Sequence, residues 1–249
     1  MNYLKKFFFV LFGVKFNGDN AVYDRYVWLK KNLVVLKKNS NLLDVGCGNG
    51  WALFLANKVG FKTSVGISWN NEEVNKIKNR TSKNQNIHTE VLDLRNLDKH
   101  NFQIKFDTVI NLENLEHIIN GDKLIKDISN LLNEGGLLYL TTPHILYKKV
   151  PGDGFINELP IEDGGHVVRG YSKERLEKIF SKYNLKIILV NYISGRFSWW
   201  LMNIQRLLPF IILKIFYIPA AVLCNFMDSI FYRDNKNNMS IAVVAEKIN

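Results

Sequence analysis

Three glycines alternate with other residues in the segment 44–50, which reads Asp-Val-Gly-Cys-Gly-Asn-Gly. An apolar run precedes this segment and a helical pattern begins at Trp51, so the segment predicts a loop between a buried strand and a helix. Glycines let the backbone approach a ligand closely, and the first turn of a helix presents unpaired amide groups. The segment therefore predicts a loop that binds a nucleotide-containing cofactor.

The spacing of the glycines separates two classes of cofactor loop. A dinucleotide fingerprint reads Gly-x-Gly-x-x-Gly, but counting from Gly46 its third glycine falls on Trp51, whose indole would obstruct close packing. The pattern Gly-x-Gly-x-Gly after Asp44 instead resembles motif I of the class I S-adenosylmethionine-dependent methyltransferases. The resemblance implies S-adenosyl-L-methionine as the cofactor. It places these residues around the methionine part: Asp44, Gly46, Cys47, Gly48 and Gly50.

The resemblance continues in the same order along the chain, over roughly residues 20 to 193. The matching segments are the ends of the second and third strands, the fourth strand with its following loop, and the fifth strand, at 65–68, 91–94, 106–117 and 131–143. This match implies that Asp93 binds the adenine amino group and that the backbone amide of Leu94 faces the ring. It also implies that Asn111, Leu112 and Glu113 border the methionine end and the site of methyl transfer.

Three of these acidic positions also have a plainer interpretation. An aspartate directly after a strand, such as Asp93, is commonly a turn former. Glu113 and Glu116 can be solvated acids at the start of a helix. The sequence leaves both interpretations open.

One position departs from the family pattern. Family members usually carry Asp or Glu at the end of the second strand, where the carboxylate accepts hydrogen bonds from both ribose hydroxyls. Here that position is Ser68, and a serine cannot form the bidentate pair. Either Glu72 or Glu73 reaches back to the ribose, or the ribose is held more weakly.

The candidate catalytic residues are His117, His166 and Arg169. We expect both histidines at carboxyl ends of strands, where open α/β sheets bind ligands, and an imidazole can take a hydroxyl proton near neutral pH. A purely structural role remains the alternative for each histidine. Arg169 lies in a long loop, residues 147–171, that we expect to shape the acceptor pocket. It either faces the substrate or pairs with Glu162 or Asp163.

Short apolar runs alternate with amphipathic segments, which is typical of βαβ units. We expect a doubly wound, seven-stranded, Rossmann-like α/β sheet with helices on both faces. The predicted strands are 41–46, 62–67, 87–92, 106–112, 136–142, 185–193 and 240–245. The predicted helices are 51–59, 71–82, 122–132 and 172–183, with a further helix around 23–29 covering the cofactor site.

A chain of 249 residues fits a single large domain. We divide it into an N-terminal helical cap (1–37), a cofactor-binding core (38–193), an apolar helical insertion (194–238) and the last strand (239–249). The insertion holds a nearly continuous apolar stretch from Trp199 to Phe231, interrupted by Lys214 and two prolines. A membrane span requires about 20 apolar residues, so we expect one or two short helices.

A second apolar segment, residues 1–12, carries Lys5 and Lys6 before a run of aromatic residues. It has no signal-peptide cleavage site and is too short to span a membrane. Both apolar segments either lie on a membrane surface or pack within the protein. With only Cys47 and Cys224, the chain offers neither a disulfide framework nor a cysteine-based zinc site, which favours the cytoplasm, with possible contact at the inner membrane surface.

These observations predict a methyltransferase that acts on a small-molecule, glycan or lipid-linked acceptor, at an oxygen atom. The net charge of +10 and the isoelectric point near 9.4 raise a first alternative, a nucleic-acid methyltransferase. No basic or aromatic module and no Asn-Pro-Pro-Tyr-like motif supports that alternative. A second alternative is a non-catalytic cofactor-binding scaffold, for which Ser68 is the main indication.

Overall fold

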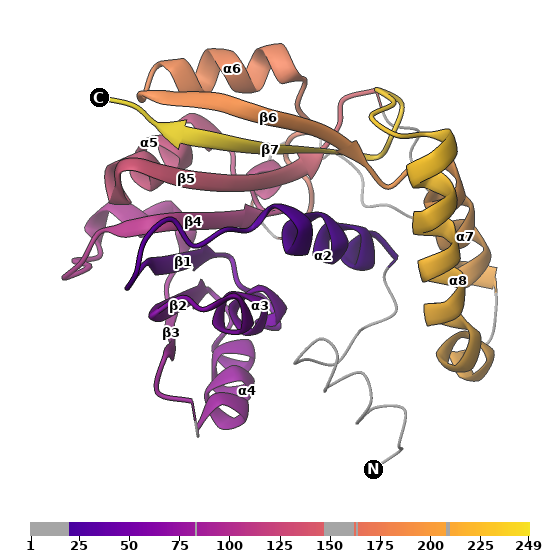
Figure 1. The fold of residues 1–249 in the computed structure, drawn as a ribbon, viewed down its shortest axis with the longest axis horizontal. Helices are drawn as coiled ribbons and strands as arrows, with labels where there is room; N and C mark the ends of the chain where they lie inside the picture. Colours follow the sequence, from indigo (N-terminus) through magenta and orange to yellow (C-terminus); the bar gives the residue numbers. More distant parts are fainter. Residues whose placement is uncertain (1–19, 83, 147–161, 163, 208–209) are drawn as a thin grey trace.

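The computed structural model describes residues 20–82, 84–146, 162, 164–207 and 210–249. Its centre is a seven-stranded sheet in the order β3-β2-β1-β4-β5-β7-β6 (Figure 1). β7 runs antiparallel to both of its neighbours, whereas the pairs among β1 to β5 are parallel. The strands are β1 Asn41–Val45, β2 Thr63–Ser68, β3 Ile87–Val91, β4 Phe106–Leu112, β5 Leu132–Pro143, β6 Leu185–Ile193 and β7 Ser240–Lys247.

Two hydrophobic cores lie on the two faces of this sheet, because side chains alternate between faces along each strand. In β1, Leu43 and Val45 belong to one core and Leu42 to the other. The first core is shared with η1, α5 and α6, and the second with α2, α3 and α4. The expected Rossmann-like sheet with helices on both faces is therefore confirmed.

The helices begin and end close to their predicted positions. Ser172 caps α6 through its hydroxyl, which accepts from the amide of Arg175, and Asn70 caps α4 in the same way. β5 begins four residues earlier than predicted because Gly135, at φ +72°, lies within the strand, whose pairing with β4 is irregular. The helices are α2 Asn20–Asn32, α3 Trp51–Val59, α4 Asn71–Thr81, η1 Leu94–Lys99, η2 Leu115–His117, α5 Gly121–Leu131 and α6 Lys173–Ser181.

Two helices separate β6 from β7: α7 Arg196–Leu207 and α8 Phe210–Phe231. They pack on each other and stand at one end of the sheet (Figure 1). The expectation of short helices is wrong for α8, which has 22 residues and continues through Pro219. The described part of the chain contains no helix long and apolar enough to cross a membrane. Residues 1–12, the other predicted apolar segment, lie outside the described residues.

Candidate functional site

The carboxyl ends of β1, β2 and β4 and the loops that follow them gather the residues predicted to bind the cofactor. The glycine loop leaves β1 and turns into α3, with Gly46, Gly48 and Gly50 all in the left-handed region (φ +85°, +48° and +81°). Only glycine adopts this conformation without strain. The alternating glycines are therefore required by the path of the loop itself.

Gly46 and Gly48 have different surroundings in this loop. A Cβ at Gly46 would lie 2.4 Å from Cγ of Asn114, whose side chain covers the glycine. A Cβ at Gly48 would meet no heavy atom within 4 Å among the described residues. The space that a ligand can use is therefore at Gly48, whereas Gly46 is needed for packing against Asn114.

The loop is held to β2 by its first two amides. The backbone nitrogens of Gly46 and Cys47 both donate to the carbonyl of Ile67, at 3.0 and 2.8 Å. The thiol of Cys47 packs toward Gly66, and burial raises its pKa. Asp44 is buried at the end of β1, and burial raises the pKa of its carboxyl to about 7. A positively charged group bound beside Asp44 would favour its ionised form.

The missing acid at the end of β2 is supplied by the next helix. The Ser68 hydroxyl donates to Oε2 of Glu73 at 3.0 Å. Asn70 caps α4 and accepts from the amides of Glu72 and Glu73, which fixes the first turn of the helix. Of the two glutamates left open by the sequence, Glu73 is the one that reaches back to Ser68.

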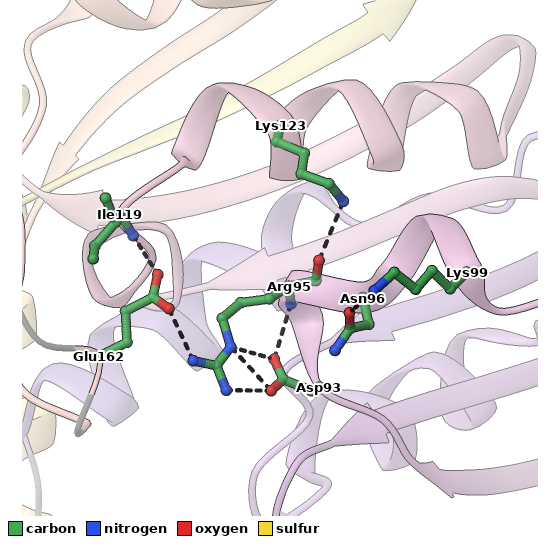
Figure 2. Close-up of polar contacts among 7 residues, drawn as sticks. All are labelled: Asp93, Arg95, Asn96, Lys99, Ile119, Lys123 and Glu162. Atoms are coloured by element: carbon green, nitrogen blue, oxygen red, sulfur yellow. Dashed lines mark hydrogen bonds and ion pairs between the residues drawn. The ribbon is translucent and has the colours of Figure 1, made fainter.

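Asp93 serves both as a cap and as an ion-pair partner. Its carboxylate accepts from the backbone amide of Arg95 at 2.9 Å and from Nε of the same arginine at 3.0 Å (Figure 2). Hydrogen bonds from Arg95 lower the pKa of Asp93. Arg95 also pairs with Glu162, whose other carboxylate oxygen accepts from the amide of Ile119. Asp93 therefore does form the turn, and an adenine amino group would join an acceptor that already has partners.

Asn111 and Asn114 connect the end of β4 to the glycine loop. Their side-chain amides donate to the carbonyl of Val45 at 2.9 and 3.2 Å. The Asn111 Oδ1 atom is buried and has no hydrogen-bond partner among the residues that the structure describes. An unpaired buried acceptor is unfavourable, and a ligand donor would satisfy it.

Two glutamates, Glu113 and Glu116, follow β4, and Arg25 acts electrostatically on both. Glu113 has a positive φ of 54°, and its carboxylate lies 3.6 Å from Arg25 of α2. Glu116 is fully buried and accepts from the Thr142 hydroxyl at 3.1 Å. Burial and the nearby charge of Glu113 raise the pKa of Glu116 well above its ordinary value. The interpretation of Glu113 and Glu116 as solvated helix-start acids is therefore wrong.

His117 and His166, the two histidines predicted as candidate bases, lie together in the structure. Their rings are 4.8 Å apart between centroids in an edge-on arrangement. His117 Nδ1 lies 3.0 Å from the carbonyl of Gly165, and because a carbonyl can only accept, Nδ1 is the donor in this contact. Nε2 lies 3.8 Å from Oε1 of Glu116. Glu116, His117 and His166 place their ligand atoms within 4.8 Å of one another, a grouping that could hold a metal ion.

Arg169 is exposed, and the pairing expected with Glu162 is wrong because Glu162 pairs with Arg95. Asp163 and residues 147–161 of the predicted acceptor loop lie outside the described residues. The loop that the structure does describe, 164–170, brings Gly165 and His166 against His117.

The sequence analysis missed His144, which also follows the carboxyl end of a strand. It comes directly after β5, is 3% exposed and has its ring against Tyr192 at 5.0 Å. Burial lowers the pKa of His144. Its position next to Pro143 at the end of the predicted strand was the signal that could have identified it.

The site fits S-adenosylmethionine at three points. The glycine loop has open space at Gly48, Asn111 offers a buried unpaired acceptor, and Glu73 stands at the end of β2 where the family carries its ribose-binding acid. The buried carboxyl of Asp44 and the half-buried carboxylate of Glu113 suit a ligand that carries a positively charged sulfonium.

Comparisons with known proteins agree with this site. A family profile described as a methyltransferase domain matches residues 23–190, more than half of the chain. The chain is 34% identical over 107 residues to a ubiquinone biosynthesis O-methyltransferase of Pelagibacter ubique, covering 42% of each protein. It is 30% identical over 165 residues to a tRNA U34 carboxymethyltransferase of Campylobacter fetus, covering 57% of this chain and 50% of that protein. The chain thus spans half or less of the length of these two relatives.

Solved structures show the same fold. A putative S-adenosylmethionine-dependent methyltransferase from Listeria monocytogenes matches with a TM-score of 0.61 at 16% identity, covering 92% of this chain and 100% of that one. A geranyl diphosphate C-methyltransferase from Streptomyces coelicolor matches with a TM-score of 0.62 at 12% identity, covering 90% and 77%. With the family profile, these findings show that the chain belongs to the methyltransferase-domain family and is an S-adenosylmethionine-dependent methyltransferase.

Proposed function

We propose that this enzyme methylates a hydroxyl oxygen of a small or lipid-linked acceptor, with His117 as the general base. The observation that supports the proposal is the contact between His117 Nδ1 and the carbonyl of Gly165, at 3.0 Å. A carbonyl can only accept, so Nδ1 donates in this contact and the ring is held with Nε2 turned away from Gly165. An imidazole positioned in this way can, in its neutral form, take a proton at Nε2 from an acceptor hydroxyl.

The surrounding residues position the acceptor and exclude water. S-adenosylmethionine, when bound, supplies a methyl carbon already activated by its sulfonium. His117 Nε2 would take the acceptor proton as the acceptor oxygen bonds to the methyl carbon and the carbon–sulfur bond breaks, which would release S-adenosylhomocysteine; His166 packs against the ring of the base. Orientation of this kind can account for roughly 7–11 kcal/mol of barrier lowering. The remaining chemistry asks little of other side chains.

The named relatives leave the acceptor class open, because one is named for ubiquinone biosynthesis, one for coclaurine and one for tRNA. Oxygen methylation of a lipid-linked acceptor is favoured here because an imidazole held by Gly165 lies at the site and the apolar helices α7 and α8 are connected to the site through α2. A glycan acceptor remains compatible with the same base. The non-catalytic alternative is opposed by the methyltransferase family itself.

The proposal is tested with S-adenosylmethionine labelled on its methyl group, incubated with the enzyme and a total extract of cellular lipids, polar metabolites or tRNA. We expect label in the lipid or metabolite fraction, in a product with the stability of an ether or ester. His117→Asn should lower the transfer rate about a hundredfold or more, the usual contribution of a general base. Label found only in tRNA, or full activity of His117→Asn, would contradict the proposal.

A further inference from the structure

One face of the α7–α8 pair presents large apolar side chains to solvent. On α8 the exposed residues are Val222, Leu223, Phe226, Ile230 and Phe231, with exposed fractions between 44% and 62%. Trp200 and Ile204 continue the exposed apolar surface on α7, at 55% and 41%. The spacing of three and four residues puts Val222, Leu223, Phe226 and Ile230 on one side of α8. Several large exposed apolar side chains on one side of a helix are typical of an interaction surface.

The opposite side of α8 is polar and fixed to the rest of the protein. The Asp228 carboxylate accepts from the backbone amides of Phe197 and Ser198, both at 2.9 Å, and so caps the start of α7. The Asn225 amide donates to the buried carboxylate of Asp24 on α2 at 2.6 Å. Since the inward side of α8 is already occupied, the apolar side faces outward in the folded protein.

The charge of the chain complements an anionic surface. The net charge of the chain is +10. Basic side chains lie at the first residue of α7 and shortly after the last residue of α8. Arg196, Arg233 and Lys236 are all exposed there. Aromatic and aliphatic side chains flanked by basic residues are typical of helices that lie in the interface of an anionic bilayer.

We infer that the outward face of α7 and α8 docks on an anionic lipid surface, and that the acceptor is presented to the enzyme from that surface. The second part rests on the proposed function. The connection to the site is short: Asn225 of α8 holds Asp24, and the next residue, Arg25, lies 3.6 Å from Glu113. A lipid-docked α8 is therefore joined through α2 to the residues at the transfer site.

The test uses the full chain and vesicles of phosphatidylcholine with or without phosphatidylglycerol, separated from free protein by sedimentation. The wild type should bind the anionic vesicles and lose most of this binding at high salt. A variant with both Leu223→Glu and Phe226→Glu should bind roughly tenfold or more weakly, because charges replace the inserted apolar groups. Ile104→Glu is the matched control: Ile104 is also exposed but precedes β4, at the opposite end of the strands from α7, and this variant should bind as the wild type does.

Calorimetric affinity for S-adenosylhomocysteine is measured on the same variants, so that loss of docking is distinguished from loss of the cofactor site. Weaker vesicle binding with unchanged cofactor affinity supports the inference. A wild type that ignores anionic vesicles at low salt overturns it, as does a double variant that binds them normally. A chain that sediments as a dimer until Leu223→Glu and Phe226→Glu dissociate it, without binding vesicles, would assign the face to a second copy instead.

Discussion

The cofactor side of the site includes local side-chain contacts, whereas the contact that orients His117 on the acceptor side joins distant parts of the chain. On the cofactor side, Ser68 bonds to Glu73 and Asp93 to Arg95, partners five and two residues apart. The long-range bonds from Asn111 and Asn114 to Val45 stand beside these local contacts. On the acceptor side, His117 contacts Gly165 across 48 positions. Local contacts form a motif that a sequence displays, whereas distant contacts exist only after the chain has folded.

The two sides of the site also differ in the contacts that fix their shape. The glycine loop is set by backbone conformation at three glycines and by bonds to the adjacent strand β2. The region where the cofactor side meets the acceptor side depends on tertiary contacts: Glu113 pairs with Arg25 on α2, and the neighbouring Asp24 accepts from Asn225 on α8. Substitutions should therefore affect cofactor affinity on the first side, and turnover or stability on the second.

The largest effect is expected from Gly48→Val. A valine at φ +48° is strained, and its side chain would enter the open space that the cofactor uses, so affinity for S-adenosylhomocysteine should fall roughly tenfold to a hundredfold. Gly60→Val is the control, because Gly60 also has a positive φ and open space but lies at the end of α3, away from the site. Calorimetry would show equal losses in both variants if the effect were only loop strain.

A second prediction concerns the buried link between α2 and α8. Burial raises the pKa of Asp24 to about 6 from an ordinary 3.8, so the folded state holds its proton more tightly than the unfolded state. Asp24 then stabilises the fold below about pH 4, and this contribution is lost as pH rises to about 6, on the order of 3 kcal/mol in total. Asp24→Asn keeps an acceptor for Asn225 and should remove this dependence. Urea unfolding at pH 4 and pH 7 measures it, and parallel pH profiles for both proteins would contradict it.

Glu73→Gln should weaken binding of S-adenosylhomocysteine by about 1–3 kcal/mol, because the carboxylate that stands in for the missing acid of β2 becomes neutral. Glu72→Gln is the matched control, since Glu72 is exposed and pairs only with Lys76 in the described structure. The comparison is made by calorimetry. Equal affinity in the two variants would mean that Ser68 alone meets the ribose.

The smallest effect is expected from Arg95→Met. The pair between Arg95 and Asp93 is exposed to solvent, and exposed ion pairs contribute little. Cofactor affinity should change by threefold or less, whereas Asp93→Ala should lower it by about tenfold if, as the family resemblance implies, the carboxylate accepts from the adenine amino group. If Arg95→Met proved as damaging as Asp93→Ala in the same calorimetric titration, the arginine and not the aspartate would be the adenine contact.

The sequence predicts the cofactor side well because its information is local. Strand ends, glycine spacing and helix caps such as Asn70 are visible within a few residues, and the structure places them as expected. The acceptor side is predicted less well. The pairing of Arg25 with Glu113 joins segments 88 positions apart, and the burial of Glu116 depends on β5.

The length of the helix α8 in the insertion also depends on distant contacts that the sequence does not display. Prolines and Lys214 in the apolar stretch suggested short helices, yet α8 continues through Pro219. A proline removes one donor from a helix, and tertiary contacts can compensate for that loss. Those contacts here are the bonds from Asn225 and Asp228 to α2 and α7, which no local pattern displays.

The most direct test of the two-sided account is a calorimetric titration of S-adenosylhomocysteine into the wild type and into His117→Asn, with the methyl-transfer rate of each measured in parallel. The account predicts tight binding to both proteins, within about threefold, and transfer lowered about a hundredfold or more only in the variant. A wild type that binds no S-adenosylhomocysteine would contradict the cofactor assignment. An equal fall in affinity and rate would show that His117 belongs to the cofactor side and that the division of the site is wrong.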